Sequence, residues 1–555
     1  MRTGRTGPAR CRRYVLRVIG SAMTNLSLLL ALSVGLAQAN PSILVNPQGL
    51  AQRDLSIRGS SYTGAGVSIN GLNLKVPYSA HFNSELPILG GLLSDPTAKY
   101  GLGNAFGHLV GTAAYTTTPQ EQYGQAGVGI GTREHYTANV SAFASGVGGF
   151  LDWEKARGID YDTNDYDRYA GGAHLQHFVN DWQIDLIGAG QEKEFGAQGY
   201  YGIPATQYAQ QQTEDSLIFL GATRGELDDA YFRTSGAWRQ FDDEYQTAGF
   251  TSDVRSRFGA VVLEGRTMEI QHIALSLRGD IESEQVDGTT GSHDRTRGSV
   301  LILPEARFER VTVKAGLNSV FQTSESAEFL PMAGIDWLAT DNSTLYAAYS
   351  ETVQQPDFQT LYDTNPFHIG NPLLQQQTSQ TAELGLRQFL SASLDWHAAA
   401  FHRRLENASD WIGGTATDLG TLNVAGVESG ISYSPSDDLK LRAFYQWLHK
   451  DNAATDGLYE LDYPEHLLNL SAYWKFLDEL AVEFAQTMRY QTENEIRTSN
   501  DFGAHASLGL HYLPRFANNV RLSFRVDNLW GSNFQAIPGL KPRPATFSSG
   551  IIINW

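Results

Sequence analysis

The sequence contains little cysteine, few basic residues relative to acidic ones, and no long apolar run. Its 555 residues include a single cysteine, Cys11, which excludes a disulfide framework and a zinc site built from several thiolates. Lys and Arg total 41 against 60 Asp and Glu, a formal net charge of −19 that argues against nucleic-acid binding, because such binding requires a basic surface. No run beyond the N-terminal region approaches the roughly 20 apolar residues of a membrane-spanning helix, so a polytopic helical membrane protein is excluded.

The motifs of common catalytic sites are absent as well. The chain contains no His-Glu-x-x-His, no Gly-x-Ser-x-Gly and no Gly-x-x-x-x-Gly-Lys sequence. Histidines such as His81, His108, His368 and His402 are scattered along the chain, a pattern more typical of polar side chains in a wet interior than of a metal site. We therefore predict that the protein is not an enzyme.

Residues 1–39 have the layout of a secretory signal. Six arginines and no acidic residue precede a mostly apolar stretch, Leu26–Leu36, which is too short to span a membrane. Ala37-Gln38-Ala39 then matches the small-x-small pattern of a signal-peptidase site. We predict that this segment is cleaved, and an uncleaved N-terminal anchor is the alternative. An acidic, cysteine-free, exported chain fits the envelope of a Gram-negative bacterium.

Apolar and polar residues alternate with a period of two across most of the remaining chain. In Val520–Val526 the apolar residues alternate with polar ones such as Arg521 and Arg525, and Leu441–Trp447 and His466–Phe476 show the same pattern. A period of two places the two sets on opposite faces of a strand, so an all-β protein is predicted. A membrane β-barrel, apolar outside and wet inside, is favoured. A large secreted β-sandwich or propeller is the alternative, although no fixed-period repeat supports the propeller.

The composition divides the chain after the signal into two parts. Residues 40–117 are rich in Gly and contain only very short strand-like pieces, such as Leu55–Ile57 and Val67–Ile69, with turn residues close by. They predict a small separate globule ahead of the barrel. Residues 118–555 can hold about 22 strands of about 20 residues each, of which roughly 10 span the bilayer.

Short motifs in both parts resemble, in family order, those of TonB-dependent outer-membrane receptors. Ile57-Arg58-Gly59, followed by Gly71, is similar to the plug signature of that family, and Tyr100-Gly101 opens a segment similar to the end of the plug. The barrel motifs follow at the family's spacing: Leu345–Ser350, Gly370-Asn371-Pro372, Glu383-Leu384-Gly385, Asn423 to Glu428, Asp527-Asn528-Leu529 and the terminal Trp555.

This resemblance implies a 22-stranded transmembrane antiparallel β-barrel in the outer membrane, with the N-terminal globule as a plug in its lumen. It implies active import of a scarce, bulky chelate or corrinoid, with the inner-membrane complex of TonB, ExbB and ExbD acting on the plug. Lipid and lipopolysaccharide would surround the barrel, and the outer-membrane assembly machinery would read Trp555 as an assembly signal. A substrate-binding lipoprotein is a further partner that the resemblance allows, and nucleic acid is not a partner.

Within the family, the barrel spacing is most similar to the vitamin B12 (cobalamin) transporter branch, including the segment Gly236–Gln246. We therefore expect a corrinoid such as vitamin B12 as the ligand, and a ferric siderophore is the second candidate. A passive, porin-like channel is the alternative from a different class. A barrel enzyme of the outer membrane is the least favoured interpretation, because no Ser/His/Asp constellation is visible.

The chain departs from the family pattern in three ways. The globule is about half the expected plug and leaves Ser42–Val45 as a candidate TonB-contacting peptide (a TonB box); the alternative is that these residues merely begin the mature chain. A plug Arg-Gly-Pro is replaced by Ser94-Asp95-Pro96, and a barrel Glu by Gln377. Losing both members of a buried ion pair costs less than losing one. We predict that one pair survives, Arg58 with Glu383, and the alternative is that both side chains face water in the lumen.

Three acidic stretches, Ile159–Arg168, Phe241–Thr247 and Asp280–Arg295, are predicted to be polar connections between strands. Longer external loops are expected in this fold, and a substrate would bind to them and to the outer tip of the plug. The candidate substrate contacts in these stretches are Tyr161, Tyr166, Phe241 and Tyr245.

The first of these stretches also has oxygen ligands at the spacing that starts a calcium loop. The residues concerned are Asp160, Asp162, Asn164 and Asp165. The Gly at position six and the Glu at position twelve of such a loop are absent. Some relatives bind calcium in external loops, so calcium is the one cofactor that the sequence suggests, and a solvated acidic turn is the alternative.

Overall fold

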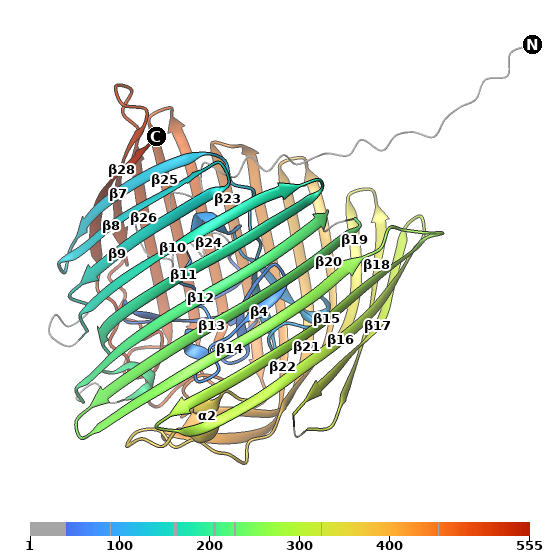
Figure 1. Cartoon of the computed structure of the whole chain (residues 1–555), viewed down its shortest axis with the longest axis horizontal. Helices are drawn as coiled ribbons and strands as arrows, with labels where there is room; N and C mark the ends of the chain where they lie inside the picture. The colour runs from blue at the N-terminus through green and yellow to red at the C-terminus, as the bar shows by residue number, and fades with distance from the viewer. Residues whose placement is uncertain are drawn as a thin grey trace, which may run out of the picture.

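The computed structural model describes residues 40–555, apart from 89, 159–163, 204–206, 227–228, 324 and 453. Within these residues, the strands from β7 (Tyr123–Gly131) to β28 (Thr546–Asn554) form one closed barrel of 22 strands, all paired antiparallel (Figure 1). The elements from β1 (Ile43–Gln48) to β6 (Gly111–Tyr115) lie inside the barrel (Figure 1). The prediction of an all-β, 22-stranded antiparallel barrel with an N-terminal plug region is confirmed.

The barrel strands follow one another in chain order around the wall. Those of the first half are β7 (Tyr123–Gly131), β8 (His135–Ala144), β9 (Val147–Ala156), β10 (Tyr166–Val179), β11 (Trp182–Gly196), β12 (Ala209–Gly225), β13 (Tyr231–Thr247), β14 (Phe250–Arg266), β15 (Ile273–Gly288), β16 (Gly291–Arg307) and β17 (Val311–Gln322). Those of the second half are β18 (Glu328–Thr340), β19 (Ser343–Gln354), β20 (Gln377–Ser391), β21 (Leu394–Ile412), β22 (Thr415–Ser436), β23 (Leu439–Lys450), β24 (Pro464–Leu477), β25 (Leu480–Gln491), β26 (Phe502–Tyr512), β27 (Val520–Asp527) and β28 (Thr546–Asn554).

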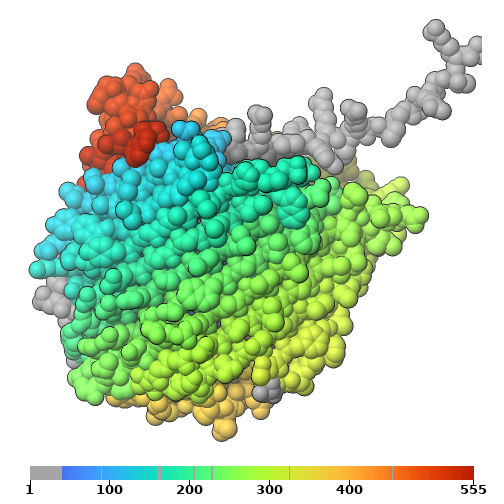
Figure 2. Space-filling model, in the orientation of Figure 1, coloured from blue at the N-terminus to red at the C-terminus, as the bar shows by residue number. Residues whose placement is uncertain are grey.

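The wall is uneven in height. β21 and β22 have 19 and 22 residues, whereas β27 has 8 and β7 and β28 have 9 each. Figure 2 shows the wall from one side, where successive strands lie as oblique bands in chain order. The short strands gather where β28 meets β7.

The period-two pattern accounts for the two faces of the wall. In β27, Phe524 is 51% exposed on the outside, while its neighbours Ser523 and Arg525 are buried on the inside. Strands closed into a barrel leave no backbone edge unpaired, which is what a sheet needs in order to span lipid. The inner face carries long polar side chains, and Arg239 and Lys193 are almost fully buried there.

The described residues of the plug form six short strands and several 3-10 turns. β1 (Ile43–Gln48) pairs with β2 (Gln52–Ile57), and a four-stranded sheet has the order β4-β3-β6-β5. The strands of this sheet are β3 (Ala65–Ile69), β4 (Leu72–Leu74), β5 (Thr97–Tyr100) and β6 (Gly111–Tyr115). The plug also contains the 3-10 helices η2 (Ala80–Phe82), η3 (Gly90–Leu92) and η4 (Gly101–Asn104). Buried plug residues such as Ile57 and Val67 share one apolar cluster with Phe219 and Phe258 of the barrel wall. The plug core and the lumen lining are therefore continuous.

The barrel closes where its last strand meets its first. β28 pairs with β7 in the register Ile553↔Ala126. Gly124 and the terminal Trp555 exchange two backbone hydrogen bonds, each 2.9 Å long. A Cβ atom on Gly124 would lie 2.1 Å from the Trp555 indole, so only glycine leaves room for the ring. We call this junction the seam.

The two ends of the barrel differ. The C-terminus lies at one end, and the short helix α2 (Phe358–Tyr362) lies at the other (Figure 1). Turns such as 341–342 and 392–393 join strands at the C-terminal end, whereas longer connections such as 355–376 and 528–545 join them at the α2 end. Short inner turns and longer outer loops are the asymmetry of outer-membrane barrels, so we call the α2 end the outer end.

One expectation about the connections is wrong. Phe241–Thr247 is the end of β13, and most of the acidic stretch from residue 280 to 295 belongs to β15 and β16. Where strands extend beyond the lipid, both faces meet water or polar plug groups, so their residues are polar on both sides and resemble a loop.

Among the described residues, no helix combines the length and apolar character that crossing a membrane requires.

Candidate functional site

Arg58 of the plug is held between two carboxylates of the barrel. It directly follows β2, and Arg58 and the adjacent Gly59 have left-handed φ angles of 51° and 70°. A non-glycine residue rarely adopts such an angle, so surrounding contacts must hold it there. The guanidinium donates to Glu428 at 2.6 and 3.0 Å and to Glu383 at 2.5 Å. One cation thus joins the plug to β20 and β22, and we call these three side chains the Arg58 clamp.

The three side chains of the Arg58 clamp are buried from solvent. Arg58 is 3% exposed, and its guanidinium lies 3.7 Å from the centroid of the Tyr100 ring and 4.3 Å from that of Phe401. Burial alone lowers the pKa of a guanidinium, but Glu428 and then Glu383 more than offset it and raise the pKa of Arg58 above its ordinary value. Arg58 therefore stays charged, and losing its partners would leave a buried charge without compensation.

The structure places Arg58 against the predicted partner Glu383 and adds Glu428, to which sequence analysis gave no role. Glu428 does belong to a recognised barrel motif, so its position in that motif was the available signal. Gln377, which replaces a family carboxylate, takes no part in the clamp and donates to Ser409 at 3.0 Å.

The remaining plug-signature residues turn the chain close to the wall. Gly71 has φ 78°, and a Cβ atom there would lie 2.7 Å from the Arg233 guanidinium. Gly101 has φ 53°, and its Cβ would lie 3.3 Å from Glu383. Ile57 is fully buried in the plug core. The signature thus serves a tight fit between plug and barrel.

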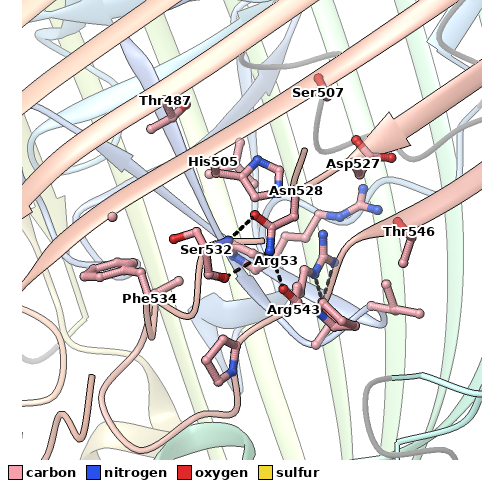
Figure 3. A pocket seen from close by; sticks show the side chains of 18 of the residues that line it. Arg53, Thr487, His505, Ser507, Asp527, Asn528, Ser532, Phe534, Arg543 and Thr546 are labelled. Atoms are coloured by element: carbon pink, nitrogen blue, oxygen red, sulfur yellow. Dashed lines mark hydrogen bonds between the residues drawn. The ribbon is translucent and has the colours of Figure 1, made fainter. Parts of the chain in front are cut away.

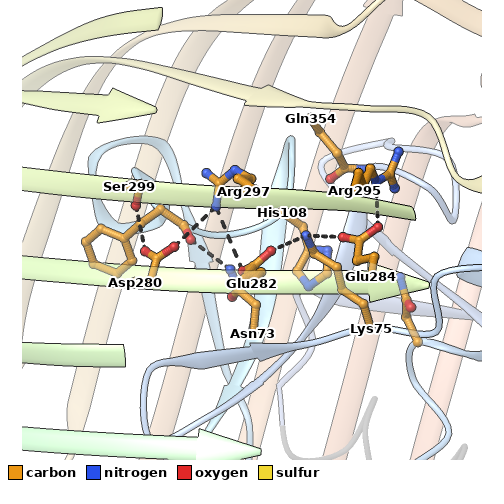
Figure 4. A network of polar contacts seen from close by, with 12 residues as sticks. Asn73, Lys75, His108, Asp280, Glu282, Glu284, Arg295, Arg297, Ser299 and Gln354 are labelled. Atoms are coloured by element: carbon orange, nitrogen blue, oxygen red, sulfur yellow. Dashed lines mark hydrogen bonds and ion pairs between the residues drawn. The ribbon is translucent and has the colours of Figure 1, made fainter. Parts of the chain in front are cut away.

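A second polar bridge joins the plug to β15 and β16 (Figure 4). Lys75 donates to Glu282 at 2.6 Å and to Glu284 at 3.3 Å. Arg295 donates to Glu284 at 2.6 Å and to the carbonyl of Pro356 at 2.7 Å. Because Pro356 lies in the connection that carries α2, a continuous set of polar contacts runs from the plug along the inner face of the wall to the outer end.

Four rings cover the plug at the outer end. Tyr62 and His81 of the plug are stacked with centroids 3.6 Å apart and planes 8° apart. Tyr201 and Tyr459, from two outer connections, pack against them at 4.9 Å from His81 and 4.7 Å from Tyr62. Asp54 lies 2.8 Å from His81 Nδ1 and fixes that ring. We call these four rings the aromatic layer, and they pack the plug against the outer connections.

The connection 355–376, at the outer end, holds a buried carboxyl group, Asp363, directly after α2. Burial raises its pKa from 3.8 to about 6, although Asn365 donates to it at 2.8 Å. Because the folded state favours the protonated form of Asp363, this group stabilises the fold fully below about pH 4. That stabilisation is lost as the pH rises through 6 and the buried carboxyl group becomes charged. Asp363→Asn should therefore stabilise the connection by about 2 kcal/mol at pH 8 and have little effect at pH 4.

Hydrogen exchange of the backbone amides in 355–376 would measure this effect. Slower exchange in Asp363→Asn at pH 8 but not at pH 4, after correction for intrinsic rates, is the expected result. An equal difference at both pH values would show that burial of the charge is not the cause.

Three of the four predicted substrate contacts, Tyr166, Phe241 and Tyr245, belong to one buried apolar cluster. Tyr166 begins β10 and donates to Glu154 at 3.3 Å, and it is buried. Phe241 lies in β13 rather than in a loop and packs on Phe82 of the plug, with centroids 4.7 Å apart. Tyr245 is on the same strand and also points inward. Tyr161 lies outside the described residues, and contact of any of the four with substrate stays a prediction.

The calcium prediction rests largely on residues that the structure does not describe, since Asp160 and Asp162 lie outside the described ranges. Asn164 donates its side-chain amide to the carbonyls of Gly196 and Gln198, each at 3.1 Å, and Asp165 accepts a backbone bond from Gly196. Over the part of the chain that the structure does describe, no group of three His, Cys, Asp or Glu side chains could hold a metal ion. Calcium binding stays a prediction.

Ser42–Val45, the candidate TonB-contacting peptide, is part of the plug rather than a separate segment. Ile43 to Val45 form the start of β1, paired with Leu55–Ile57 of β2, and Ile43 is fully buried. For these residues to contact TonB as an extended peptide, β1 would have to leave its sheet.

Comparison with known proteins identifies the family. The family described as "TonB dependent receptor-like, beta-barrel" matches residues 95–529, more than half of the chain. The chain belongs to the TonB-dependent receptors. Family membership indicates the outer membrane as the location of this receptor, energy coupling through TonB, and a small-molecule ligand.

Solved structures with the same fold include an iron transporter, a copper transporter and a ferric enterobactin receptor. The FrpB iron transporter of Neisseria meningitidis (F3-3 variant) has a TM-score of 0.73 and 11% identity, covering 94% of this chain and 96% of that one. The copper transporter OprC has a TM-score of 0.72 and 13% identity, covering 93% and 94%. The ferric enterobactin receptor PfeA of Pseudomonas aeruginosa, in a mutant form, has a TM-score of 0.72 and 13% identity, covering 94% and 96%.

At these identities the likeness shows the fold alone. A search of curated proteins finds no match to this sequence. The family and the structural neighbours of this TonB-dependent receptor are receptors and transporters, not enzymes.

Proposed function

We propose that this receptor imports a scarce, bulky ligand across the outer membrane, driven by the TonB, ExbB and ExbD complex. The Arg58 clamp carries the proposal. A plug fastened by a buried ion cluster obstructs the lumen, and displacing it requires an energy source. Ligand binding at the outer end must favour one plug state over another if binding and energy input are to be coupled.

A corrinoid such as vitamin B12 is the first candidate ligand. It is supported by the resemblance of Gly236–Gln246 and the barrel spacing to the cobalamin branch. The aromatic layer lies at the outer end, and aromatic rings are suitable contacts for a large ring-shaped ligand if binding exposes them. A ferric siderophore is the second candidate, and the likeness to a ferric enterobactin receptor and to an iron transporter supports it.

Growth of a deletion strain would test the proposal. The strain should lose growth on limiting cobalamin if the ligand is a corrinoid, or on limiting iron if it is a ferric siderophore. The gene supplied on a plasmid should restore growth only when TonB is present, because the plug must be pulled. Growth restored equally without TonB, or large steady currents through the purified protein, would favour the passive porin-like channel instead.

A further inference from the structure

A cavity of about 210 Å³ lies beside the plug near the outer end, between the β1–β2 hairpin and strands β24–β28, β8 and β9 (Figure 3). Its plug side is formed by residues of the hairpin, from Ile43 to Arg53. Its barrel side includes the connection 528–545, which carries Phe534 and Arg543. This space is separate from the aromatic layer, none of whose four rings lines it.

Three guanidinium groups line the cavity with no carboxylate within ion-pairing distance among the described residues. Arg489 donates to the Asn46 side chain at 2.7 Å, and Arg543 donates from Nε to the Gly49 carbonyl at 2.6 Å. The Arg53 guanidinium makes no hydrogen bond to any described residue. In the described part of the chain, none of the three forms an ion pair within 4.0 Å.

The acidic side chains of the cavity are already engaged. Glu154 lies 3.0 Å from His135 Nε2 and 3.7 Å from the guanidinium of Arg168. Asp527 accepts from Arg525 at 3.0 Å. Two further cations and a second imidazole also line the space: Arg133, Lys541 and His505. Among the described lining residues, basic side chains therefore outnumber the carboxylates.

This excess is costly because the groups are withdrawn from water. Arg489 is 8% exposed, and burial, followed by repulsion from Arg53, lowers the pKa of Arg543 to about 10. Elsewhere at the plug-barrel interface, Arg58 and Arg239 are buried against carboxylates at 2.6 and 2.7 Å. A buried cation needs a partner of opposite charge, and none of the described carboxylates lies within 4.0 Å of Arg53, Arg489 or Arg543, although Glu154 attracts Arg53 from farther away.

We propose that this cavity is a binding site for a small oxyanion, a carboxylate- or phosphate-bearing molecule held by Arg53, Arg489 and Arg543. Guanidinium groups suit such ligands because their N–H donors match paired oxygens. Phe534 and Leu540 give the site an apolar side for the remainder of the molecule. Drug-sized ligands need pockets of roughly 300–1,000 Å³, so this space excludes an intact corrinoid or siderophore. The anion is thus distinct from the bulky cargo, or is one acidic arm of it.

Calorimetric titration of the purified full-length receptor in a neutral detergent tests the proposal, with inorganic phosphate and citrate as probes at constant ionic strength. We expect saturable binding of at least one probe. Arg53→Gln and Arg489→Gln should each weaken it at least tenfold, because each removes one of three contacts. The matched control is Arg310→Gln, which removes an exposed cation paired with Asp341 and should leave binding unchanged.

A second measurement needs no variant. The thermal midpoint of the unaltered receptor should rise in phosphate or citrate relative to chloride at equal ionic strength, because a ligand bound to the folded state alone stabilises it. No saturable binding and no rise would overturn the proposal, and so would binding that the Arg53 and Arg489 substitutions leave intact. If lipopolysaccharide phosphate is the natural occupant, probe binding in detergent should vanish in nanodiscs containing lipopolysaccharide.

These measurements use neither TonB nor uptake. A receptor that binds the anion but imports nothing would refute the proposed transport and leave the anion site supported. A receptor that imports normally but binds neither probe would refute the anion site and leave the proposed transport supported.

Discussion

Arg58→Ala is expected to release the plug from the barrel wall. The substitution leaves Glu383 and Glu428 buried beside each other with no cation, and breaking a buried ion pair in this way costs about 3–5 kcal/mol. It also removes the side chain that holds a left-handed backbone angle at residue 58. The plug should then leave the lumen more often, giving frequent large conductance steps and faster proteolysis of residues 40–117 in otherwise folded barrels.

Restoring charge balance provides the matched variant. Arg58→Ala combined with Glu383→Gln and Glu428→Gln removes all three charges and should recover much of the closed state. Arg310→Ala, which breaks an exposed pair with Asp341, should behave as the unaltered protein. A triple variant as leaky as Arg58→Ala would show that the clamp does not hold the plug.

Removal of Trp555 should cause the second large effect, a loss of closed barrels in the membrane. Trp555 provides both backbone hydrogen bonds to Gly124 at the end of the seam, and its ring packs on that glycine. Without it the last strand is shorter by one pair at the place where the sheet must close. We expect at least a tenfold drop in the heat-resistant, compact form of the protein seen by electrophoresis without boiling.

Two variants separate the ring from the backbone at the seam. Trp555→Phe keeps a terminal aromatic residue and should retain most closed barrel. Gly124→Val retains Trp555 but displaces its ring, so it should resemble the deletion. Gly259→Val is the matched control, because a Cβ at Gly259 of β14 meets no atom within 4 Å. Normal amounts of closed barrel from Gly124→Val would contradict this role of the seam.

The architecture of the wall could be predicted because its cause is local. Alternation along segments such as Val520–Val526 reports directly on an apolar outer face and a polar inner face. The pattern failed at Phe241–Thr247 and around residues 280–295, because these strand ends lie beyond the lipid and their polar residues occupy both faces. Local composition cannot tell such a strand from a loop.

The site was less predictable because its contacts depend on register across the barrel. Glu383 could be paired with Arg58 through family motifs, but Glu428 reaches the same cation only because β20, β21 and β22 are neighbours in one fixed stagger. Lys75 meets Glu282 more than two hundred positions away, and nothing near either residue indicates the other. The cavity lined by Arg53 and Arg489 likewise exists only after closure.

The uneven strand lengths give the barrel one low flank and one high flank. The 8 residues of β27 extend about 27 Å and, at a tilt of about 45°, rise only about 19 Å, less than the roughly 25 Å apolar band of outer-membrane barrels. Exposed Phe516 and Trp530, in the connections at the two ends of β27, extend that apolar surface only in part. Acyl chains beside β27 and β28 must therefore shorten, whereas those beside the 19 residues of β21 need not. This thinning of the bilayer on one side of the barrel favours contact with other membrane proteins that thin the bilayer equally. In a crowded membrane it therefore biases which side of the receptor faces a neighbouring protein.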